Sequence, residues 1–389
     1  MMKTQKRRKF IKEIGIGSGT LLWSFPFFNF GCNPKKETRE TNETNNTENQ
    51  AKKLGIALVG LGNYSSGQLA PALQETKFCE LRGIVTGTPE KEKKWADQYK
   101  IPKENIYNYK TFDKIIDNKD IDIVYVVLPN SMHSEYVIRA AEAGKHVICE
   151  KPMAIEVKEC EEMIAACKKA GKKLSVGYRL HFEPYNREMM RLGQQKIHGD
   201  IKELESGFGF KIGDPTQWRL KKELSGGGPL MDVGIYAIQA AIYTLGELPI
   251  SVMAESKTVD TQKFKGVEEV ITWEFEFPSG IVVKSKSSYA DNYNFVKAKT
   301  EKASFGLEPA YSYGGLKGYV NDKTMDFPDI NQQAAQMDAF AQCIMEDKES
   351  TVPGEMGMRD VELLQAIYQS AETGKKISLD LKAKILDKV

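Results

Sequence analysis

An alternation of apolar strands and helices after residue 53 constrains the fold of this chain more than any other feature. Strands are expected at Leu54–Val59, Leu81–Val85, Ile123–Leu128 and His146–Cys149, and helices at 90–99, 111–117 and 133–143. Strands that alternate with helices over about 100 residues predict a parallel, doubly wound sheet whose crossover connections are right-handed. The N-terminal half is therefore expected to be an α/β domain.

A glycine-rich turn follows the first of these strands. Gly60 and Gly62 come directly after Val59, where backbone N–H groups at a helix N-terminus can receive a nucleotide pyrophosphate. Ser65 stands where the full G-x-G-x-x-G pattern has its third glycine, so an ordinary tight turn is the alternative. The strand–turn–helix context favours a dinucleotide site.

The residues after the second strand bear on which dinucleotide binds. An NAD site usually ends this strand with Asp or Glu, which binds the ribose 2′-hydroxyl. Here Thr86 and Gly87 follow Val85, and Lys91 comes shortly afterwards. Hydroxyl and ammonium groups suit a 2′-phosphate, so NADP is favoured over NAD. A polar loop with a solvated lysine is the alternative.

Polar residues also follow the fourth and fifth strands, where ligands bind in an open α/β sheet. Leu128 and Asn130 end the fourth strand, and His133 opens the next helix, as a ligand contact or as a plain cap-region residue. Glu150 and Lys151 directly follow the fifth strand, so Lys151 is expected to project into the crevice. A lysine there can polarise a hydroxyl or lower the pKa of a neighbouring acid. A surface lysine before a rigid proline turn is the alternative.

The second half of the chain carries a different pattern. Apolar and polar residues alternate from Ile271 to Phe277, which predicts a strand with one apolar face. Pro278-Ser279-Gly280 then turns the chain into a return strand. A sheet of this kind must cover its apolar face with helices or with a second subunit.

A run of three glycines, 226–228, precedes a further expected helix. Pro229 follows this run and is suited to the first turn of that helix. Asp232 and Tyr236 are four residues apart on it, so their side chains share one face. An acid near a helix N-terminus is favoured by the helix dipole, and a helical tyrosine usually lies in the core. A purely structural pair is therefore the alternative to a catalytic one.

Several of these motifs together resemble the Gfo/Idh/MocA oxidoreductase superfamily. They are Gly60-Leu61-Gly62-Asn63-Tyr64, Leu128-Pro129-Asn130-Ser131, Glu150-Lys151-Pro152-Met153, Gly177-Tyr178-Arg179, Gln217-Trp218-Arg219 and the run from Gly226 to Tyr236. Most members carry His where this chain has Tyr236, and the tyrosine resembles the glucose–fructose oxidoreductase subgroup. The similarity spans residues 52–375 and is patchy over 291–330, where Tyr311 and Tyr313 are candidate lining residues.

The resemblance implies two domains. A Rossmann domain that binds NADP is expected at 52–175. It is followed at 176–389 by an α+β domain with an open, mostly antiparallel sheet, which serves substrate binding and oligomerisation. The C-terminal helices are expected to pack back on the first domain. A homo-oligomer, either a dimer or a tetramer, is implied as well.

The resemblance also assigns roles to single residues. The implied catalytic residues are Lys151, Asp232 and Tyr236, which would meet at the nicotinamide. Tyr236 would be the acid/base, because the Lys151 ammonium favours a phenolate, and Asp232 would orient the substrate hydroxyl or Lys151. The implied substrate contacts are Lys151, Tyr178, Arg179, Asp232 and Tyr236. The implied cofactor contacts are Gly60, Gly62, Asn63, Tyr64, Thr86, Gly87, Lys91, Leu128, Asn130, His133, Glu150, Lys151, Arg179, Trp218 and Arg219.

The implied reaction is an NADP-dependent sugar oxidation with a tightly bound cofactor that is recycled internally. A glucose-like aldose would become its lactone, and a fructose-like ketose would become a polyol, by ping-pong hydride transfer. Two alternatives stay open. One is an NAD-dependent glycoside hydrolase of the same superfamily, and the other is a non-catalytic sugar-binding member.

The first residues resemble an export signal. Arg7 and Arg8 precede a moderately apolar stretch over 14–30, as in a twin-arginine signal, here over 1–31. A basic cytoplasmic tail is the alternative. Export would place the protein where no free NADP pool exists, which is the reason to expect a cofactor that stays bound.

A lipid anchor and a tether are expected next. Phe30-Gly31-Cys32 resembles the end of a lipoprotein box, with Cys32 as the lipidated residue. Residues 32–51 are almost entirely polar and cannot bury enough surface to offset their ordering entropy, so they predict a flexible tether. The expected location is periplasmic, or membrane-anchored as a lipoprotein.

Charge and cysteine content narrow the function classes. The chain has 55 Lys+Arg and 53 Asp+Glu, a net charge of +2, and nine of the bases but only five of the acids lie in the first 51 residues. The remainder is slightly acidic, which argues against a nucleic-acid partner and suits a neutral sugar. Six cysteines and four histidines without a C-x-x-C pattern predict no metal site, and Cys160 and Cys167 are expected to be buried thiols.

Overall fold

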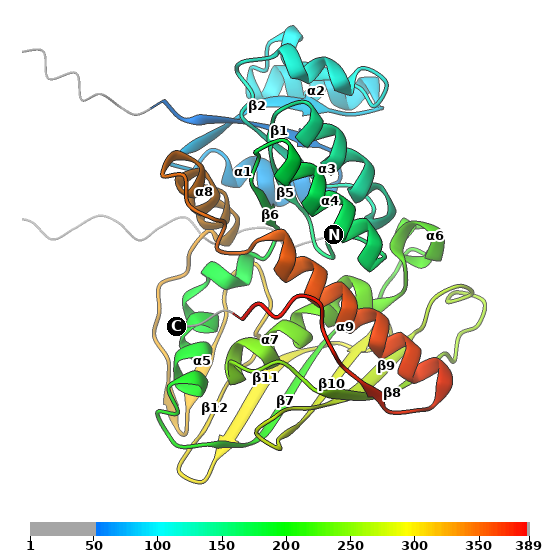
Figure 1. Cartoon of the computed structure of the whole chain (residues 1–389), viewed down its shortest axis with the longest axis vertical. Helices are drawn as coiled ribbons and strands as arrows, with labels where there is room; N and C mark the ends of the chain where they lie inside the picture. The colour runs from blue at the N-terminus through cyan, green and yellow to red at the C-terminus, as the bar shows by residue number, and fades with distance from the viewer. Residues whose placement is uncertain (1–51, 387–389) are drawn as a thin grey trace, which may run out of the picture. The chain divides into compact units, whose positions relative to one another are not determined.

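Two β-sheets organise the computed structural model, which describes residues 52–386 (Figure 1). The first sheet has six parallel strands in the order β3-β2-β1-β4-β5-β6. These strands are β1 (Leu54–Val59), β2 (Cys79–Val85), β3 (Ile106–Tyr107), β4 (Ile123–Val126), β5 (His146–Cys149) and β6 (Leu174–Val176). This order is that of a Rossmann fold, and it confirms the predicted doubly wound sheet.

The helices of the described residues are α1 (Ala70–Ala72), α2 (Pro89–Tyr99), α3 (His133–Glu142), α4 (Val157–Lys169), α5 (Pro184–Gln194), α6 (Lys222–Ser225), α7 (Ile235–Leu245), α8 (Gln332–Met345) and α9 (Gly354–Thr373). Strand β1 is buried on both faces by some of them. Ile56 and Leu58 belong to one apolar core with α1, α2 and α8, whereas Ala57 and Val59 belong to another with α3 and α4. Burial on both sides explains why β1 is continuously apolar.

One predicted element has a different form. The helix expected at 111–117 is a 3₁₀ helix, Phe112–Asp117. Phe112 and Ile115 are its buried residues. Side chains three residues apart eclipse each other in a 3₁₀ helix, so this geometry turns both into the core in one short segment.

The second sheet has nine strands in the order β14-β13-β12-β11-β7-β10-β9-β8-β15. These strands are β7 (Ile201–Gly209), β8 (Ser251–Lys257), β9 (Val270–Glu276), β10 (Val282–Ser288), β11 (Tyr293–Thr300), β12 (Ser304–Leu307), β13 (Gly318–Val320), β14 (Lys323–Thr324) and β15 (Ile377–Ser378). The pairs are antiparallel except for β7 with β10. The predicted open, mostly antiparallel sheet is therefore confirmed.

Helices cover one face of this second sheet. Helices α7 and α9 lie against it (Figure 1), and Ile271, Trp273 and Phe275 of β9 are buried on that side. Thr272 and Glu274 alternate with them and are exposed on the opposite face. The predicted alternation thus marks a strand that is half covered.

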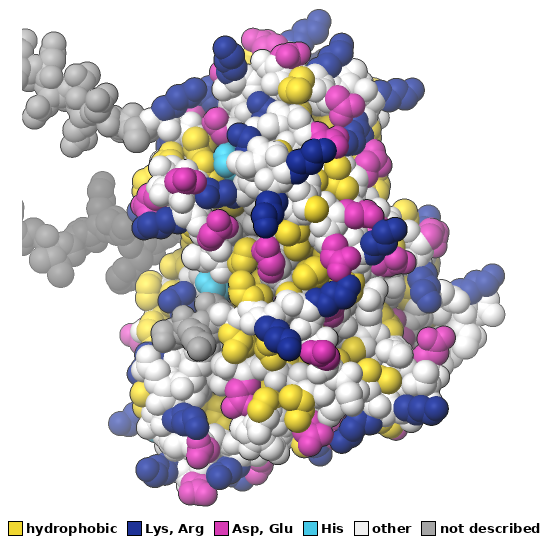
Figure 2. Space-filling view, viewed as in Figure 1, with side chains coloured by type: hydrophobic (Ala, Val, Ile, Leu, Met, Phe, Trp, Pro, Cys, Tyr) yellow, Lys and Arg dark blue, Asp and Glu magenta, His cyan; other side chains and the backbone are white. Residues whose placement is uncertain are grey.

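The C-terminal part of the chain also contacts the first sheet. Met337 and Phe340 of α8 share a core with Ile56 of β1. Cys160 and Cys167 on α4 are buried free thiols, as predicted. On the face drawn in Figure 2, basic and acidic side chains are interspersed, in keeping with the small net charge.

The predicted leader lies outside the described residues. The signal at 1–31, Cys32 and the tether at 32–51 all fall there. Within residues 52–386, no helix is both long and apolar enough to span a bilayer.

Candidate active site

Segments from both domains meet at the carboxyl ends of the first sheet. Lys151 is the second residue after β5, and Arg179 is the third residue after β6. Asp232 and Tyr236 come from the helical segment 230–245, whose first turn is π-helical and continues into α7. Parallel strands bring their carboxyl ends to one edge, which is why residues so distant in sequence converge here.

Lys151 lies between the other two predicted catalytic residues. Its Nζ donates a 2.6 Å hydrogen bond to the backbone carbonyl of Asp232 and lies 3.9 Å from the Oδ1 atom of that residue. The same Nζ is 4.7 Å from the centre of the Tyr236 ring. Only 13% of the Lys151 side chain is exposed. The structure therefore brings Lys151, Asp232 and Tyr236 together, with the ammonium in contact with both partners.

The Asp232 carboxylate is held by a second set of donors. Its Oδ2 accepts hydrogen bonds from Nε of Arg219 at 2.9 Å and from the hydroxyl of Tyr289 at 3.0 Å. Burial works to raise the pKa of Asp232, but Arg219, Lys151 and the Tyr289 hydroxyl outweigh it and hold the pKa below its ordinary value. Asp232 is thus an ionised carboxylate with one oxygen fixed by two donors and the other facing Lys151.

Tyr236 is almost completely buried among cations and aromatic rings. Its ring stacks on Tyr311 with centroids 5.9 Å apart and an angle of 21°. Cζ of Arg179 lies 5.1 Å from the ring centre, in addition to the Lys151 ammonium. Two positive charges therefore lie against the ring that would carry negative charge once its hydroxyl gives up a proton.

Arg179 holds a segment of the second domain in place at this point. Its guanidinium donates to the backbone carbonyls of Tyr311 (2.6 Å) and Ser312 (3.1 Å) and to the side-chain oxygen of Gln332. It also lies 4.4 Å from the centre of the Tyr313 ring, whose side chain is 48% exposed. Arg179 is itself buried, so it fixes the segment 311–313 at the edge of the crevice.

Glu150 is buried behind Lys151. It accepts a 2.6 Å hydrogen bond from the hydroxyl of Tyr125, which in turn accepts one from Gln336 of α8 at 2.8 Å. Burial raises the pKa of Glu150, and the Tyr125 hydroxyl and Lys151 oppose that shift. Glu150 thus connects the loop after β5 to α8.

The predicted dinucleotide turn has the required form. Gly60 has a φ of +95°, and a Cβ atom there would lie 2.4 Å from the carbonyl oxygen of Val127. Gly62 faces open space. Nζ of Lys91 reaches back from α2 to the carbonyl of Leu61 at 2.9 Å, which places a cation beside the turn. These residues fit a dinucleotide that carries a 2′-phosphate.

Other predicted cofactor contacts surround that turn. Asn63 is exposed, Tyr64 is half-buried with its ring 5.8 Å from that of Tyr313, and the Thr86 hydroxyl accepts from the backbone N–H of Thr88 at 3.2 Å. Gly87 follows Thr86 at the end of β2 and packs beside Tyr109.

Three predicted contacts, Leu128, Asn130 and His133, are engaged with neighbouring protein groups. Asn130 donates to the carbonyl of Ser225 at 2.8 Å. The ring nitrogens of His133 lie 2.9 Å from the carbonyl of Leu128 and 3.0 Å from that of Pro152, so His133 bridges the loops after β4 and β5.

Two further predicted contacts, Tyr178 and Trp218, are also engaged with other protein residues. Tyr178 is fully buried, and the charges that act on it are those of Asp360 and Arg359 in α9. The structure groups it with α9 and not with Lys151. Trp218 stacks under the guanidinium of Arg219, whose Cζ is 4.8 Å from the ring, so it supports a residue that holds Asp232.

Tyr289 is a residue of the site that the sequence pattern missed. It directly follows β10 and is buried, and burial raises its pKa, so it stays protonated and donates to Asp232. No motif surrounds it. The one signal was its place at the end of the predicted return strand, beside the site in space but 57 residues from Asp232.

Known proteins are similar to this chain in sequence and in fold. Residues 54–178 match the family model described as "Oxidoreductase family, NAD-binding Rossmann fold", and residues 186–304 match the "GFO/IDH/MocA C-terminal domain". The D-xylose 1-dehydrogenase of Haloarcula marismortui, whose name specifies NADP(+), is 28% identical over 341 residues, which cover 83% of this chain and 92% of that protein. The D-glucoside 3-dehydrogenase of Escherichia coli is 31% identical over 279 residues, 66% of this chain and 79% of that protein.

A solved structure is also similar to this chain in fold and sequence. The aldose-aldose oxidoreductase from Caulobacter crescentus, complexed with glycerol, has a TM-score of 0.82 and 42% sequence identity, and the match covers 84% of this chain and all of that one. The two family models match the chain in the order of its two domains, the first over the parallel sheet and the second over most of the other sheet. The chain belongs to the Gfo/Idh/MocA family of oxidoreductases, several of whose members are sugar dehydrogenases.

Proposed function

We propose that this chain is an NADP-dependent sugar oxidoreductase that oxidises an aldose at its anomeric carbon to the lactone. The observation that carries the proposal is the single ammonium of Lys151, which contacts Asp232 and the Tyr236 ring at once. The names of the relatives support sugar substrates, and two of them specify NADP(+). The cation at Lys91 and the glycine turn support the same cofactor.

The residues of the site would have separate roles in this reaction. Bound NADP would supply the hydride acceptor. The oxygen of Tyr236 takes the proton of the anomeric hydroxyl, and the cations of Lys151 and Arg179 lie against its ring. The Oδ1 atom of Asp232 accepts a hydrogen bond from a sugar hydroxyl, since its Oδ2 is already held by two donors. In the reverse direction Tyr236 returns the proton to a carbonyl oxygen.

The proposal includes internal recycling of the cofactor. A second sugar would take the hydride back, so that no external nicotinamide is consumed. A ketose is the acceptor predicted from the sequence, and the name of the Caulobacter crescentus protein supports an aldose in that place. Both acceptors use the proton that Tyr236 holds after the first half-reaction.

A labelling experiment tests this proposal. The purified protein is passed through gel filtration, its nicotinamide is extracted and identified, and it is then incubated with glucose deuterated at C1 together with unlabelled fructose or a second aldose. We expect NADP to remain bound and deuterium to appear in the polyol. Complete loss of nicotinamide, or a polyol without label, would contradict internal recycling.

A second candidate is oxidation at another carbon, because the Escherichia coli relative is a D-glucoside 3-dehydrogenase. Methyl glucoside has no free anomeric hydroxyl and separates the two reactions. Turnover of glucose but not of methyl glucoside supports oxidation at the anomeric carbon, and equal turnover of both supports the second candidate.

We also propose export and assembly. Cells that carry the full chain with Arg7→Lys and Arg8→Lys should retain in the cytoplasm a protein that is otherwise exported, and labelling with a fatty acid should fail for Cys32→Ala if this residue is lipidated. Fractionation that finds the unaltered chain in the cytoplasm would contradict the export proposal.

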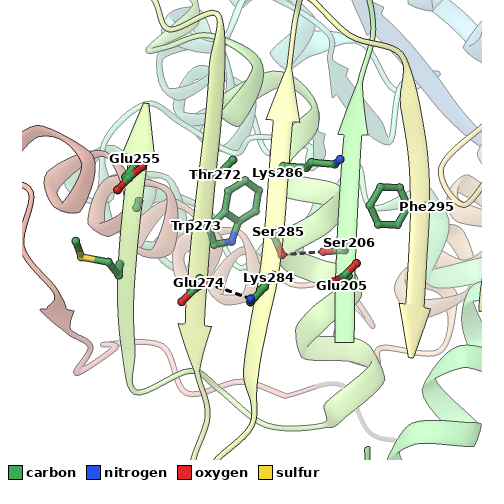
Figure 3. A pocket seen from close by; sticks show the side chains of 12 residues that line it. Glu205, Ser206, Glu255, Thr272, Trp273, Glu274, Lys284, Ser285, Lys286 and Phe295 are labelled. Carbon is green, nitrogen blue, oxygen red and sulfur yellow. Dashed lines mark hydrogen bonds and ion pairs between the residues drawn. The ribbon is translucent and has the colours of Figure 1, made fainter. Parts of the chain in front are cut away.

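The uncovered face of the second sheet supports a homo-oligomer. Charged and aromatic side chains line a depression there (Figure 3). Glu274 and Lys284 form an ion pair across β9 and β10 at 3.9 Å, and Nζ of Lys286 lies 4.5 Å from the Tyr293 ring. Aromatic rings are enriched at interfaces between subunits, and charges of both signs on this face can pair with those of a second copy of the chain. Sedimentation should give a dimer or tetramer that Lys286→Glu weakens; a monomeric wild type would contradict this.

A further inference from the structure

The glycines ahead of the catalytic helix are surrounded by two side chains from distant segments. A Cβ atom at Gly227 would lie 2.0 Å from the hydroxyl of Tyr368 in α9. A Cβ atom at Gly228 would lie 2.5 Å from the backbone oxygen and 2.9 Å from the carboxylate of Glu268. Glu268 lies in the long connection between β8 and β9, which Figure 1 shows as a loop beyond the sheet. The glycines are therefore needed because Glu268 and Tyr368 fill this space.

The Glu268 carboxylate binds the beginning of the catalytic helix. Its Oε2 accepts a hydrogen bond from the N–H of Gly228 at 2.9 Å, and its Oε1 accepts from the N–H of Leu230 at 3.1 Å and from the hydroxyl of Tyr368 at 2.9 Å. The first N–H groups of a helix have no partner within the helix, and a negative charge is favoured beside them. Glu268 therefore acts as a cap supplied from 38 residues away.

The residues fixed in this way lead directly to the reacting groups. Asp232 comes two residues after Leu230, and its backbone N–H donates to the carbonyl of Gly228 at 3.3 Å. Its own carbonyl accepts the bond from Lys151. Tyr236 lies four residues further along the same helical segment. A shift of the helix start would therefore move Asp232, Tyr236 and the carbonyl that binds the Lys151 ammonium together.

We propose that Glu268 is a positioning residue for Asp232 and Tyr236, which rests on the proposed function of those two residues. Glu268 reaches the reaction only through the helix start that it caps. A misplacement of reacting groups by about 1 Å can lower a rate on the order of 100-fold. The effect belongs in kcat, because Glu268 binds only the helix start and Tyr368, and the two groups that it positions act at the reacting hydroxyl.

The neighbouring residue provides a matched control. Glu269 is also buried, and its Oε2 accepts hydrogen bonds from the N–H groups of Val259 at 2.6 Å and Asp260 at 2.9 Å. Glu268 and Glu269 thus each bind two backbone N–H groups and belong to one connection. They differ in what they hold, because the partners of Glu269 lie in the connection itself and those of Glu268 lie at the catalytic helix.

The test compares Glu268→Gln with Glu269→Gln in the full chain with its nicotinamide bound. We expect Glu268→Gln to lower kcat on the order of 10- to 100-fold with KM for the aldose changed less than about threefold. Glu269→Gln should keep kcat within about twofold. If Glu268→Gln does not fold, Tyr368→Phe removes one of the three donors and should lower kcat by a few-fold. An unchanged kcat in the folded variant, or equal losses in both glutamine variants, would overturn the proposal.

Hydrogen exchange separates this inference from the proposed function. Amide exchange in the peptide 226–236 should accelerate in Glu268→Gln, and exchange in 257–266 should accelerate in Glu269→Gln. If the wild type turned over no sugar, the proposed function would fail while this exchange pattern could still be measured. If the wild type is active and the exchange of 226–236 does not change, the positioning role fails instead.

Discussion

Two carboxylate–arginine pairs of this chain use the same groups in different surroundings. In α9, Arg359 donates through Nε to Oδ1 of Asp360 at 2.7 Å, and neither side chain has any exposed surface. Near the crevice, Arg219 donates through Nε to Oδ2 of Asp232 at 2.9 Å. There, 35% of the Arg219 side chain and 15% of the Asp232 side chain remain exposed.

The other hydrogen bonds of each pair explain why one is fully buried and the other is partly exposed. Arg359 also donates to the carbonyl of Ile385, and Gln239 of α7 donates to Asp360, so this pair joins three segments inside the core. The pair at Asp232 instead leaves one carboxylate oxygen facing Lys151 and the crevice. The inner pair therefore joins core segments, and removal of one partner would leave a buried charge unpaired, whereas the outer pair is available for chemistry.

The largest expected effect concerns the phenol beside the outer pair. Tyr236→Phe should lower kcat on the order of 10²- to 10⁴-fold, because it removes the group that takes the proton. The ring still packs on Tyr311, so the melting temperature should change little. Tyr311→Phe is the matched control, since it removes a hydroxyl that donates to the carbonyl of Phe295 at 3.1 Å. Wild-type turnover by Tyr236→Phe would favour a non-catalytic sugar-binding protein.

Replacing each arginine in turn tests the comparison itself. Arg359→Met leaves the Asp360 carboxylate buried without its cation and should lower the free energy of unfolding by about 3–5 kcal/mol. Arg219→Met leaves Asp232 with Lys151 and Tyr289, so its loss of stability should be much smaller while kcat falls. Denaturant unfolding and steady-state rates measure both quantities. If Arg219→Met proved the more destabilising variant, the two pairs would not differ in role as described.

The sequence predicted the parts of the site that belong to local motifs. Lys151 was found because it directly follows a recognisable strand, and Asp232 and Tyr236 because they follow three glycines and a proline on one helix face. Tyr289 and Glu268 were not found. Their partners are 57 and 38 or 40 residues away, and neither the end of a strand nor a surface connection has a periodicity that reports such a contact.

The same limit appears in the fold. Strand β1 was predicted with its final bounds, because burial on both faces leaves a continuous apolar run. A helix was expected at 111–117, and the structure has a 3₁₀ helix at 112–117, because the spacing of its two buried side chains fits three residues per turn. His133 stood in sequence where a ligand contact was possible, and only the folded chain shows two carbonyl partners for its ring.

The dependence of stability on pH sharpens the role of Asp232. The folded pKa of Asp232 lies below the ordinary value, so its contribution to stability is present above about pH 4 and is lost as the pH falls through the lowered pKa. The difference in unfolding free energy between wild type and Asp232→Asn should therefore shrink from pH 7 to pH 3. At pH 7, kcat of this variant should fall about 10- to 100-fold, because bonds to a charged group contribute about 1.5–3 kcal/mol.

Glu150 provides a control in which the pKa shift has the opposite sign. Burial raises the pKa of Glu150, so folding disfavours its ionised form, and Glu150→Gln should gain stability relative to wild type as the pH rises. Denaturant unfolding at both pH values measures the two trends. The same sign for both variants would contradict the charge states assigned here.

The smallest expected effect comes from Tyr289, which donates to Asp232 beside Arg219. Tyr289→Phe removes one of the two donors to Oδ2 of Asp232 and leaves Arg219 in place. One hydrogen bond contributes about 0.5–1.5 kcal/mol, so kcat should fall about 3- to 10-fold. The acid limb of the pH–rate profile should move to higher pH, because Asp232 loses a donor that lowers its pKa. A loss of rate without this movement would mean that Tyr289 acts by packing, and the outer network would then end at Arg219.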